Sequence, residues 1–218
     1  MGGKNSVNSA DLGTGPERVL HLLKEAGPSD AESLASRLSV TGTAIRQHLY
    51  ILRDRDLVVA RSEPRPMGRP AKIWELTKAS ESFFPRSGSP MLESLLKSTQ
   101  NMLGVDGMRT AICGCVEDQV DRYRQRLLGK RSLLAKLKAL VEIRNQDGFM
   151  AQLERQSDGS FLLYENHCPI AEAVASCAQL CDAELMIFKQ LLSDQAEIER
   201  VEHMDGGDRR CSYRIVHR

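Results

Sequence analysis

Long apolar runs are missing from this chain of 218 residues. No stretch approaches the ~18 consecutive apolar residues that a membrane-spanning helix needs, and the N-terminal segment lacks the apolar core of a secretory signal. An excess of charge is also missing, since 30 Lys and Arg face 29 Asp and Glu, for a net charge of +1. We therefore expect a cytoplasmic protein without a membrane partner. The charge balance excludes a uniformly basic nucleic-acid binder but allows a local basic patch.

Aromatic residues and the motifs of familiar enzymes are scarce as well. Only 5% of the residues are aromatic, although 41% are hydrophobic, which is enough for a folded core. The sequence has no phosphate-binding glycine loop, no His-Glu-x-x-His motif and no Ser-His-Asp set. We therefore expect a protein that is not an enzyme. Its six cysteines, in a reducing compartment, are more typical of metal ligands, reactive thiols or small core residues than of disulfides.

The first part of the chain predicts a winged helix-turn-helix domain over residues 15–87, after a disordered tail at residues 1–14. Ser29 and Glu32 have the form of a capping box at the start of the second helix. A loop rich in Pro, Gly and Arg separates two short strands. The expected elements are helices at 16–26, 31–38 and 43–55, and strands at 57–60 and 71–76.

Residues 88–218 predict a second domain that gives the whole chain an α+β fold, with helices and a small antiparallel sheet. Two or three helices are expected between about residues 90 and 143, and one further helix at 171–192. Strands are expected at 149–155, 161–165, 199–204 and 210–216. One helical stripe is more apolar than a short helix beside a linker can bury, which predicts a homodimer. This stripe consists of Leu92, Leu95, Leu96 and Leu103.

The third helix and the loop between the two strands carry the residues expected to contact DNA. Residues 43–72 contain seven Lys or Arg and three acidic residues, a local excess of +4 that is typical of phosphate contact. Arg and Gln supply the forked donors that base edges require, and Thr can contact a thymine methyl group or a phosphate. The expected DNA-binding residues are Thr43, Arg46, Gln47, Tyr50, Arg53, Arg65, Arg69 and Lys72.

The same region resembles winged-helix regulators of the ArsR/DeoR kind. The resemblance is carried by Thr41 to Leu49, by Leu57-Val58 and by Gly68 to Thr77. It covers residues 16–85 and implies double-stranded DNA as a partner, without indicating the operator sequence.

Four cysteines in the last part of the chain form a candidate metal site: Cys168, Cys177, Cys181 and Cys211. Cys177 and Cys181 are four residues apart, so on one helix both thiols would share a face. Arg209 and Arg210 precede Cys211, and neighbouring cations favour the thiolate that binds metal. Thiolate ligands suit zinc or an iron–sulfur cluster, and the spacing alone does not choose between them.

The C-terminal part also resembles SufR-type repressors. The matching segments are Glu165 to Ala171, Leu180 to Phe188, Arg200 to His203 and Gly207 to Ile215. The resemblance implies an iron–sulfur cluster, [4Fe–4S], on Cys168, Cys181 and Cys211, and control of genes for cluster assembly.

The resemblance leaves the fourth ligand open. Some members of that family have a further cysteine between the positions of Cys181 and Cys211, and this chain has none there. Cys177 is the expected substitute, and water or another group is the alternative. His167 and His203 are possible stand-in ligands, although each is more typical of a structural histidine. Cys113 and Cys115 are interpreted as packing residues.

The hypothesis from sequence is a dimeric repressor that senses a cluster. Such a dimer presents two recognition helices about one DNA turn apart, roughly 34 Å, to a palindromic operator. The resemblance implies that the loaded form represses. The alternatives are a winged-helix regulator with structural zinc, a regulator of the same fold that senses an apolar ligand, and a thiol-redox enzyme using Cys177 and Cys181.

Overall fold

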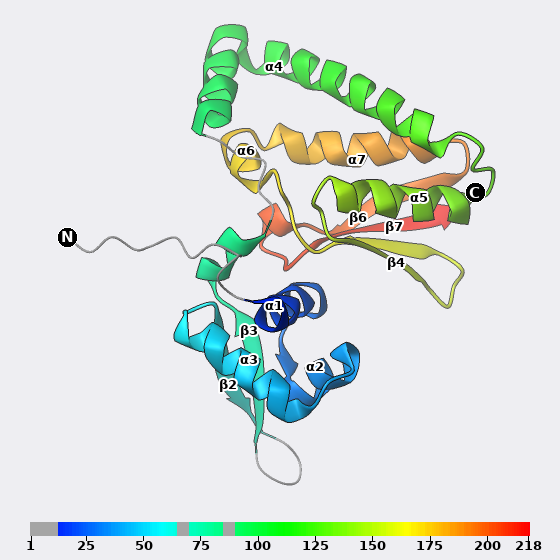
Figure 1. Cartoon of the computed structure of the whole chain (residues 1–218). Helices are drawn as coiled ribbons and strands as arrows, with labels where there is room; N and C mark the ends of the chain where they lie inside the picture. The colour runs from blue at the N-terminus through cyan, green and yellow to red at the C-terminus, as the bar shows by residue number, and fades with distance from the viewer. Residues whose placement is uncertain (1–12, 65–69, 85–89) are drawn as a thin grey trace. The chain divides into compact units, whose positions relative to one another are not determined.

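The computed structural model describes residues 13–64, 70–84 and 90–218. The chain divides into two compact units, with the boundary between Phe84 and Pro85 (Figure 1). Of the tail expected at residues 1–14, only Gly13 and Thr14 are described, and Thr14 already belongs to the first helix. In the described part of the chain, no helix combines the length and the apolar character needed to cross a bilayer.

The N-terminal unit has the helix-turn-helix and hairpin plan that the sequence predicts. Its small antiparallel sheet has the strand order β1-β3-β2, and the core contains the fully buried side chains of Leu20, Leu34, Ile45, Leu49 and Trp74. The elements are α1 (Thr14–Ala26), β1 (Ser29–Asp30), α2 (Ala31–Leu38), α3 (Gly42–Asp54), β2 (Val58–Glu63), β3 (Ala71–Leu76) and a 3₁₀ helix (Lys78–Phe83).

The expected capping box at Ser29 and Glu32 is wrong. Asp30 is the N-cap of α2, and its carboxylate accepts a hydrogen bond of 2.8 Å from the Ser33 backbone N–H. Ser29 instead pairs with Trp74 in the sheet, and its hydroxyl donates to the Gly27 carbonyl. The strand pairing shifts the start of the helix by one residue, because Ser29 is already extended.

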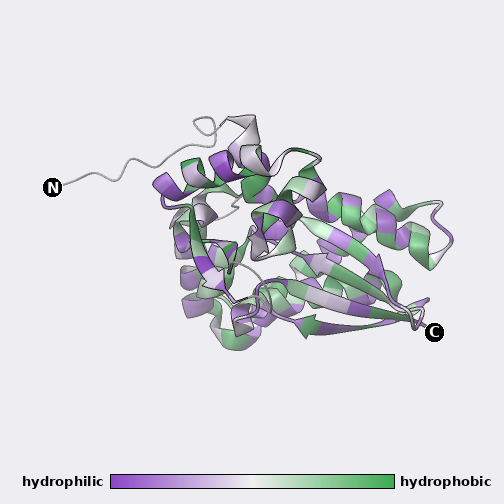
Figure 2. Ribbon diagram, turned by 90° about the horizontal axis from the view of Figure 1, so that it is seen from below, coloured by the Kyte–Doolittle hydropathy of each residue, from purple (hydrophilic) through white to green (hydrophobic). Residues whose placement is uncertain are grey.

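The C-terminal unit packs helices against a four-stranded antiparallel sheet with the order β4-β5-β7-β6. Helices α5 and α7 contact strands of the sheet, and α4 lies against α7 and α5 (Figure 1). Buried residues recur at every second position at the start of β6 (Ala196–Glu202), as expected for a strand with one covered face, whereas four of the five residues of β5 are buried. Figure 2 shows both hydrophobic and hydrophilic residues on the strands of this unit. The elements are α4 (Pro90–Leu127), α5 (Leu133–Gln146), β4 (Ala151–Arg155), β5 (Phe161–Glu165), α6 (Ala171–Ser176), α7 (Gln179–Leu192), β6 (Ala196–Glu202), a 3₁₀ turn (Met204–Gly206) and β7 (Cys211–His217).

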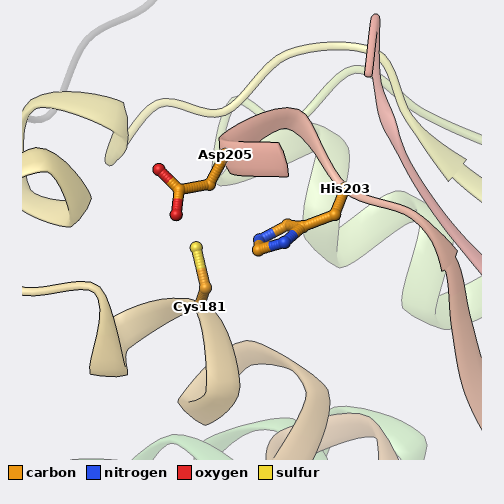
Figure 3. A group of neighbouring side chains, drawn as sticks. All are labelled: Cys181, His203 and Asp205. Carbon is orange, nitrogen blue, oxygen red and sulfur yellow. The ribbon is translucent and has the colours of Figure 1, made fainter. Parts of the chain in front are cut away.

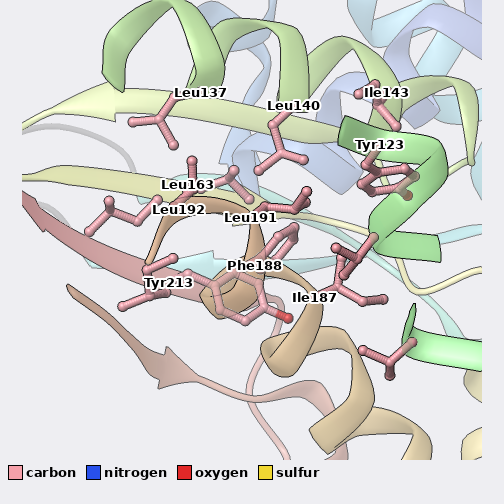
Figure 4. Close-up of a cluster of buried hydrophobic side chains, with 14 of the residues drawn as sticks. Tyr123, Leu137, Leu140, Ile143, Leu163, Ile187, Phe188, Leu191, Leu192 and Tyr213 are labelled. Atoms are coloured by element: carbon pink, nitrogen blue, oxygen red, sulfur yellow. The ribbon is translucent and has the colours of Figure 1, made fainter. Parts of the chain in front are cut away.

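The core of this unit is a single hydrophobic cluster that joins all its layers (Figure 4). Leu137 and Leu140 of α5, Leu163 of β5 and Leu192 of α7 are completely buried. The Phe188 and Tyr213 rings meet edge to face, with their centroids 4.7 Å apart. Burying side chains of this size contributes roughly 1.5–3 kcal/mol each, so this cluster fixes α7 and β7, which both carry candidate ligands.

The prediction of two or three helices between about residues 90 and 143 is confirmed, because Gly104, with a left-handed φ of 68°, divides residues 90–127 into two helices and α5 is the third. One later helix differs from the sequence prediction. The single helix expected at 171–192 is wrong, because α6 ends at Ser176 and α7 begins at Gln179. Cys177 lies in the break, with an extended backbone at φ −151° and ψ 89°. Cys177 and Cys181 therefore do not share a helical face, although no Gly or Pro in the sequence marks the break.

Candidate functional site

Helix α3 presents the residues that were expected to contact DNA. The Thr41 side chain accepts a hydrogen bond of 3.2 Å from the Ala44 backbone N–H, which fixes the start of the helix. Ile45, Leu49 and Leu52 point into the core. The exposed residues of the same helix include Thr43, Arg46, Gln47, Tyr50 and Arg53, so the expected polar set lies on the solvent face.

Strand β3 adds a further cation to this face. The exposed Lys72 places its ammonium group 5.6 Å from the centre of the Tyr50 ring and 5.0 Å from that of Trp74. The Arg53 guanidinium lies 5.0 Å from the Tyr50 ring. Tyr50 therefore holds two cations near one another, through cation–π contacts. Arg65 and Arg69, which were expected to take part, lie outside the described residues.

An acidic partner of Arg46 was not foreseen from the sequence. The Arg46 guanidinium donates to the carboxylate of Glu32 on α2, and both side chains remain substantially exposed. These two residues border a groove of 650 Å³ that also reaches Tyr50, Lys72 and Trp74. Because the groove contains both signs of charge, a DNA phosphate that binds Arg46 has to compete with Glu32. The two residues are 14 positions apart, too far for a helical-spacing rule to find.

Three of the four expected cysteine ligands lie near one another. Cys168 lies between β5 and α6, Cys181 lies in α7, and Cys211 is the first residue of β7. Burial raises the pKa of Cys168 from 9.0 to about 12, and the neighbouring Cys211 and Cys181 raise it further. Burial likewise raises the pKa of Cys181 to about 11, again with a contribution from Cys211. Cys211 thus acts on both Cys168 and Cys181, and Cys181 acts on Cys168, so the three thiols lie near one another.

Backbone donors and one arginine surround the thiols. The Ile170 backbone N–H donates to the Cys168 sulfur, and the Met204 N–H donates to the Cys211 sulfur. The cation that lowers the pKa values of Cys181 and Cys211 is Arg200. Arg209 and Arg210 were expected in this role, but the Arg210 guanidinium binds Glu202 at 2.7 Å and covers the Tyr164 ring at 3.8 Å.

A second group of donors shares Cys181. The Cys181 sulfur, a His203 ring nitrogen and an Asp205 carboxylate oxygen all lie within 4.8 Å of one another (Figure 3). Cys181 and His203 are partly buried and Asp205 is exposed. His203 was considered as a stand-in ligand from its sequence, whereas Asp205 was missed because a carboxylate in a Gly-rich turn has no distinguishing pattern.

The other three cysteines are placed differently. Cys177, the expected fourth ligand, is 5% exposed and belongs to the hydrophobic cluster. Cys113 and Cys115 both lie in α4, where Cys113 is half-buried and Cys115 is exposed.

Next to the thiols lies a buried ionic cluster that was also missed. The Arg144 side chain is fully buried; its Nε donates to Glu165 at 2.6 Å, and its guanidinium also donates to Glu184. Its Nη1 lies 3.3 Å from the Tyr123 hydroxyl, which donates to Asp147. Glu165 pairs in register with Cys211 on β7. The only feature of the sequence that points to this cluster is Arg144 itself, a charged residue four positions after Leu140 on the apolar face of α5.

The donor set fits a metal or a cluster better than it fits redox catalysis. A reactive thiol needs a lowered pKa, whereas burial raises the pKa values of Cys168, Cys181 and Cys211. A bound metal displaces thiol protons and compensates the charge, and N–H donors to sulfur are features of iron–sulfur sites. These directions disfavour the thiol-redox alternative.

The apolar-ligand alternative has a cavity in the same unit. It has a volume of 790 Å³ and lies among α4, α6 and α7. Leu92, Leu96, Ile170 and Leu180 contribute its apolar lining, while Tyr123 and Glu184 connect it to the Arg144 cluster.

Comparison with known proteins gives weak structural likenesses. No protein-family model and no curated protein matches the chain. RV1404 from Mycobacterium tuberculosis aligns at 20% identity and a TM-score of 0.32, covering 63% of this chain and 76% of that one. A mutant of Lactococcus lactis ZitR aligns at 15% identity and a TM-score of 0.30, covering 66% and 80%. Bacillus subtilis PadR in complex with operator DNA aligns at 14% identity and a TM-score of 0.28, covering 62% and 94%. Scores this low do not establish a common fold.

Proposed function

We propose that this protein is a homodimeric DNA-binding transcriptional repressor whose operator affinity is set by an iron–sulfur cluster, [4Fe–4S], bound by Cys168, Cys181 and Cys211. The observation that carries the proposal is the convergence of these thiols from a loop, a helix and a strand, close enough that Cys211 and Cys181 raise the pKa of Cys168 and Cys211 raises that of Cys181. The Ile170 and Met204 backbone N–H groups donate to Cys168 and Cys211 respectively, and such donors favour the thiolate that binds metal. Control of cluster-assembly genes is the part that rests on the resemblance to SufR-type repressors.

The three thiols do not meet the spacing of a single zinc ion. Ligands of a single tetrahedral zinc lie roughly 4 Å apart. Among the described residues, the three thiols do not form a group whose ligand atoms all lie within 4.8 Å. Structural zinc remains a second candidate, because Cys181, His203 and Asp205 do meet that limit.

The proposed DNA surface is the exposed face of α3 with Lys72. Gln47 is exposed on α3, and a Gln on the outer face of a recognition helix can donate and accept hydrogen bonds at a base edge. Arg53 and Lys72, held near each other by Tyr50, are suited to a phosphate. Gln47 lies on the side of α3 opposite its buried residues Ile45, Leu49 and Leu52.

The proposed dimer surface is the first half of α4. Leu95 and Leu103 are 61% and 52% exposed, and Met91 and Met102 are 82% and 83% exposed. Exposed apolar side chains in this number along one helix are typical of a protein–protein contact. A twofold dimer requires a palindromic operator.

Contacts between α7 and α4 link the thiol site to the helix that carries the proposed dimer surface. Cys181 lies on α7, and α7 packs along α4. A bound cluster would join the start of α7 to the loop after β5 and to the start of β7. Losing that link frees the start of α7 and so changes the support of α4, which sets the spacing of the two DNA-binding units.

The decisive experiment is anaerobic purification followed by iron, sulfide and zinc analysis, with operator binding measured on the loaded and apo forms by fluorescence anisotropy. We expect iron and inorganic sulfide in equal amounts and weaker operator binding after cluster removal. Zinc without iron would contradict the cluster. Equal operator affinity of the two forms would contradict the sensor mechanism even if the cluster is present.

A variant of the recognition helix tests the DNA surface separately. We expect Gln47→Ala to weaken binding to the operator by about 1–3 kcal/mol, because a base-reading side chain contributes that much discrimination. The matched control is Gln152→Ala, which removes an exposed Gln from β4. An unchanged affinity in Gln47→Ala would show that α3 does not read the bases.

A further inference from the structure

We propose that His203 is the fourth protein ligand of the metal site formed by Cys168, Cys181 and Cys211. This inference rests on the proposed function for the three thiols. His replaces Cys as a ligand in some iron–sulfur centres, and it also binds zinc beside Cys.

The turn after β6 brings His203 to the thiols. A ring nitrogen of His203 lies within 4.8 Å of the Cys181 sulfur, and Figure 3 shows the two side chains pointing toward one another. The turn is held by its own hydrogen bonds: the His203 N–H donates to Asp208 Oδ2 at 2.7 Å, and the His203 carbonyl accepts from Gly206 N–H at 2.9 Å. Gly207 closes it with a left-handed φ of 100°.

The same turn also contacts Cys211. The backbone N–H of Met204, the residue after His203, donates to the Cys211 sulfur. One short segment therefore contacts one thiol through its backbone and approaches a second through the His203 ring. A residue placed in this way can complete a site that the three thiols leave with one position open.

Arg200 contacts the same ring. Its Nη1 lies 3.4 Å from His203 Nε2, and since a guanidinium can only donate, Nε2 accepts this hydrogen bond and a metal bound at Nε2 would take the place of the Arg200 donor. The same guanidinium donates to the Cys181 carbonyl. Arg200 therefore acts as a positioning residue that links the ring to the residue whose thiol it faces, and its positive charge offsets that of the thiolates.

The competing candidates for the fourth position are weaker. Cys177 is 5% exposed within the hydrophobic cluster, in the break between α6 and α7. Asp205 is close to Cys181 but exposed, and its carboxylate adds a negative charge beside the thiolates. Imidazole is neutral and suits both zinc and iron.

The test compares wild type, His203→Ala and His203→Cys as full-length chains, with Cys177→Ala and Asp205→Asn as controls. Each is loaded anaerobically with iron and sulfide and analysed for metal content, reduction potential and nitrogen hyperfine coupling to the reduced cluster. We expect the nitrogen coupling in wild type and in both controls, and its loss in both His203 variants. His203→Ala should also lose roughly a quarter of its iron, as expected if one iron of a four-iron cluster loses its protein ligand.

His203→Cys guards against a folding defect, because it restores a fourth ligand. It should keep the full iron content, with a reduction potential more negative than that of wild type, since a thiolate replaces a neutral ring. A wild-type cluster without nitrogen coupling, or coupling that persists in His203→Ala, overturns the role of His203 and leaves the proposed function standing.

A measurement with zinc distinguishes a failure of the proposed function from a failure of the His203 assignment. If the purified chain carries zinc and no cluster, the proposed function fails, but His203 is still tested by zinc dissociation. His203→Ala should then release zinc at least tenfold more readily than wild type, with Cys177→Ala unchanged. Equal zinc retention in His203→Ala and wild type overturns the inference.

Discussion

Two clusters of buried ionisable groups lie side by side in the C-terminal unit, and they are built in opposite ways. Around Arg144, one guanidinium meets two carboxylates and a tyrosine hydroxyl. Burial alone would lower the pKa of Arg144, but Glu165 and Glu184 together raise it well above its usual value. Around the thiols, burial is the leading effect, and it raises the pKa values of Cys168 and Cys181 above that of an exposed thiol.

The difference lies in the charges that each cluster brings together. The Arg144 groups satisfy one another, as buried charges must. The three thiols carry no opposite charges that could neutralise one another, and the nearby backbone N–H donors and Arg200 favour a negative charge that protonated thiols do not carry. The first cluster stabilises the fold, and we propose that the second binds a metal or an iron–sulfur cluster, so each of the following changes should affect one cluster far more than the other.

The largest expected effect is on the free energy of unfolding, through the Arg144 cluster. Arg144→Ala leaves the buried Glu165 and the partly buried Glu184 without their partner, and breaking a buried pair in this way typically costs about 3–5 kcal/mol. Urea unfolding of the apo protein measures this loss. The matched control is Arg214→Ala, which removes the exposed partner of Asp158 and should leave the unfolding midpoint unchanged. Equal midpoints for both variants would show that the buried cluster does not stabilise the fold.

The next largest effect concerns the three thiols of Cys168, Cys181 and Cys211. Metal loading should stabilise the protein, because a ligand that binds only the folded state adds about 3 kcal/mol at a free concentration about a hundredfold above its Kd. The measurement is anaerobic thermal unfolding of the loaded and apo forms. Cys168→Ser should abolish the difference between them, while Cys115→Ser, on the exposed side of α4, should keep it. A loaded form no more stable than the apo form would contradict a site that links α7 to β7.

The sequence predicts more of the structure in the N-terminal unit than in the C-terminal unit. In the N-terminal unit, local rules predict the orientation of α3, because the apolar stripe Ile45, Leu49 and Leu52 gives its buried side and hence its exposed side. The strand at 71–76 has the predicted bounds. What local rules miss is the Glu32–Arg46 contact, because it joins two helices whose relative placement depends on packing.

In the C-terminal unit, the sequence identified the candidate ligands but not their arrangement. The spacing of Cys177 and Cys181 predicted a shared helical face, yet the backbone turns at Cys177 and places its thiol in the core. In the sequence, nothing distinguishes Arg144 from other charged residues, because its carboxylate partners come from β5 and α7. Both features depend on contacts between segments far apart in the chain, which periodicity does not encode.

A smaller effect should appear with pH in the apo protein. The pKa of Cys168 is raised to about 12 and that of Cys181 to about 11, from 9.0 in an exposed thiol. The unfolded chain therefore releases these protons first. The stability is fully present below about pH 9 and is lost as the pH rises toward the folded pKa values, by at most about 1.4 kcal/mol per pH unit for each thiol, less the effect of its partial exposure.

Urea unfolding of the apo chain between pH 8 and about pH 10 tests this slope. The double variant Cys168→Ala and Cys181→Ala should lose less stability over the same range than wild type. Parallel pH profiles for the two proteins would show that the thiols are not desolvated in the folded state.

The smallest expected effect is at Cys177, a buried thiol that belongs to neither cluster. Its surroundings are apolar, and a cysteine in such a place behaves as a small hydrophobic residue. Cys177→Ala should therefore cost about 1 kcal/mol from the apolar area it no longer buries. Because the thiol is not expected to bind metal, the cost should be the same in the apo and loaded forms, and iron content should not change. Iron analysis together with unfolding of both forms separates this from the ligand role expected from the sequence. Loss of iron, or a larger cost in the loaded form than in the apo form, would restore Cys177 as a ligand and remove the open position assigned to His203.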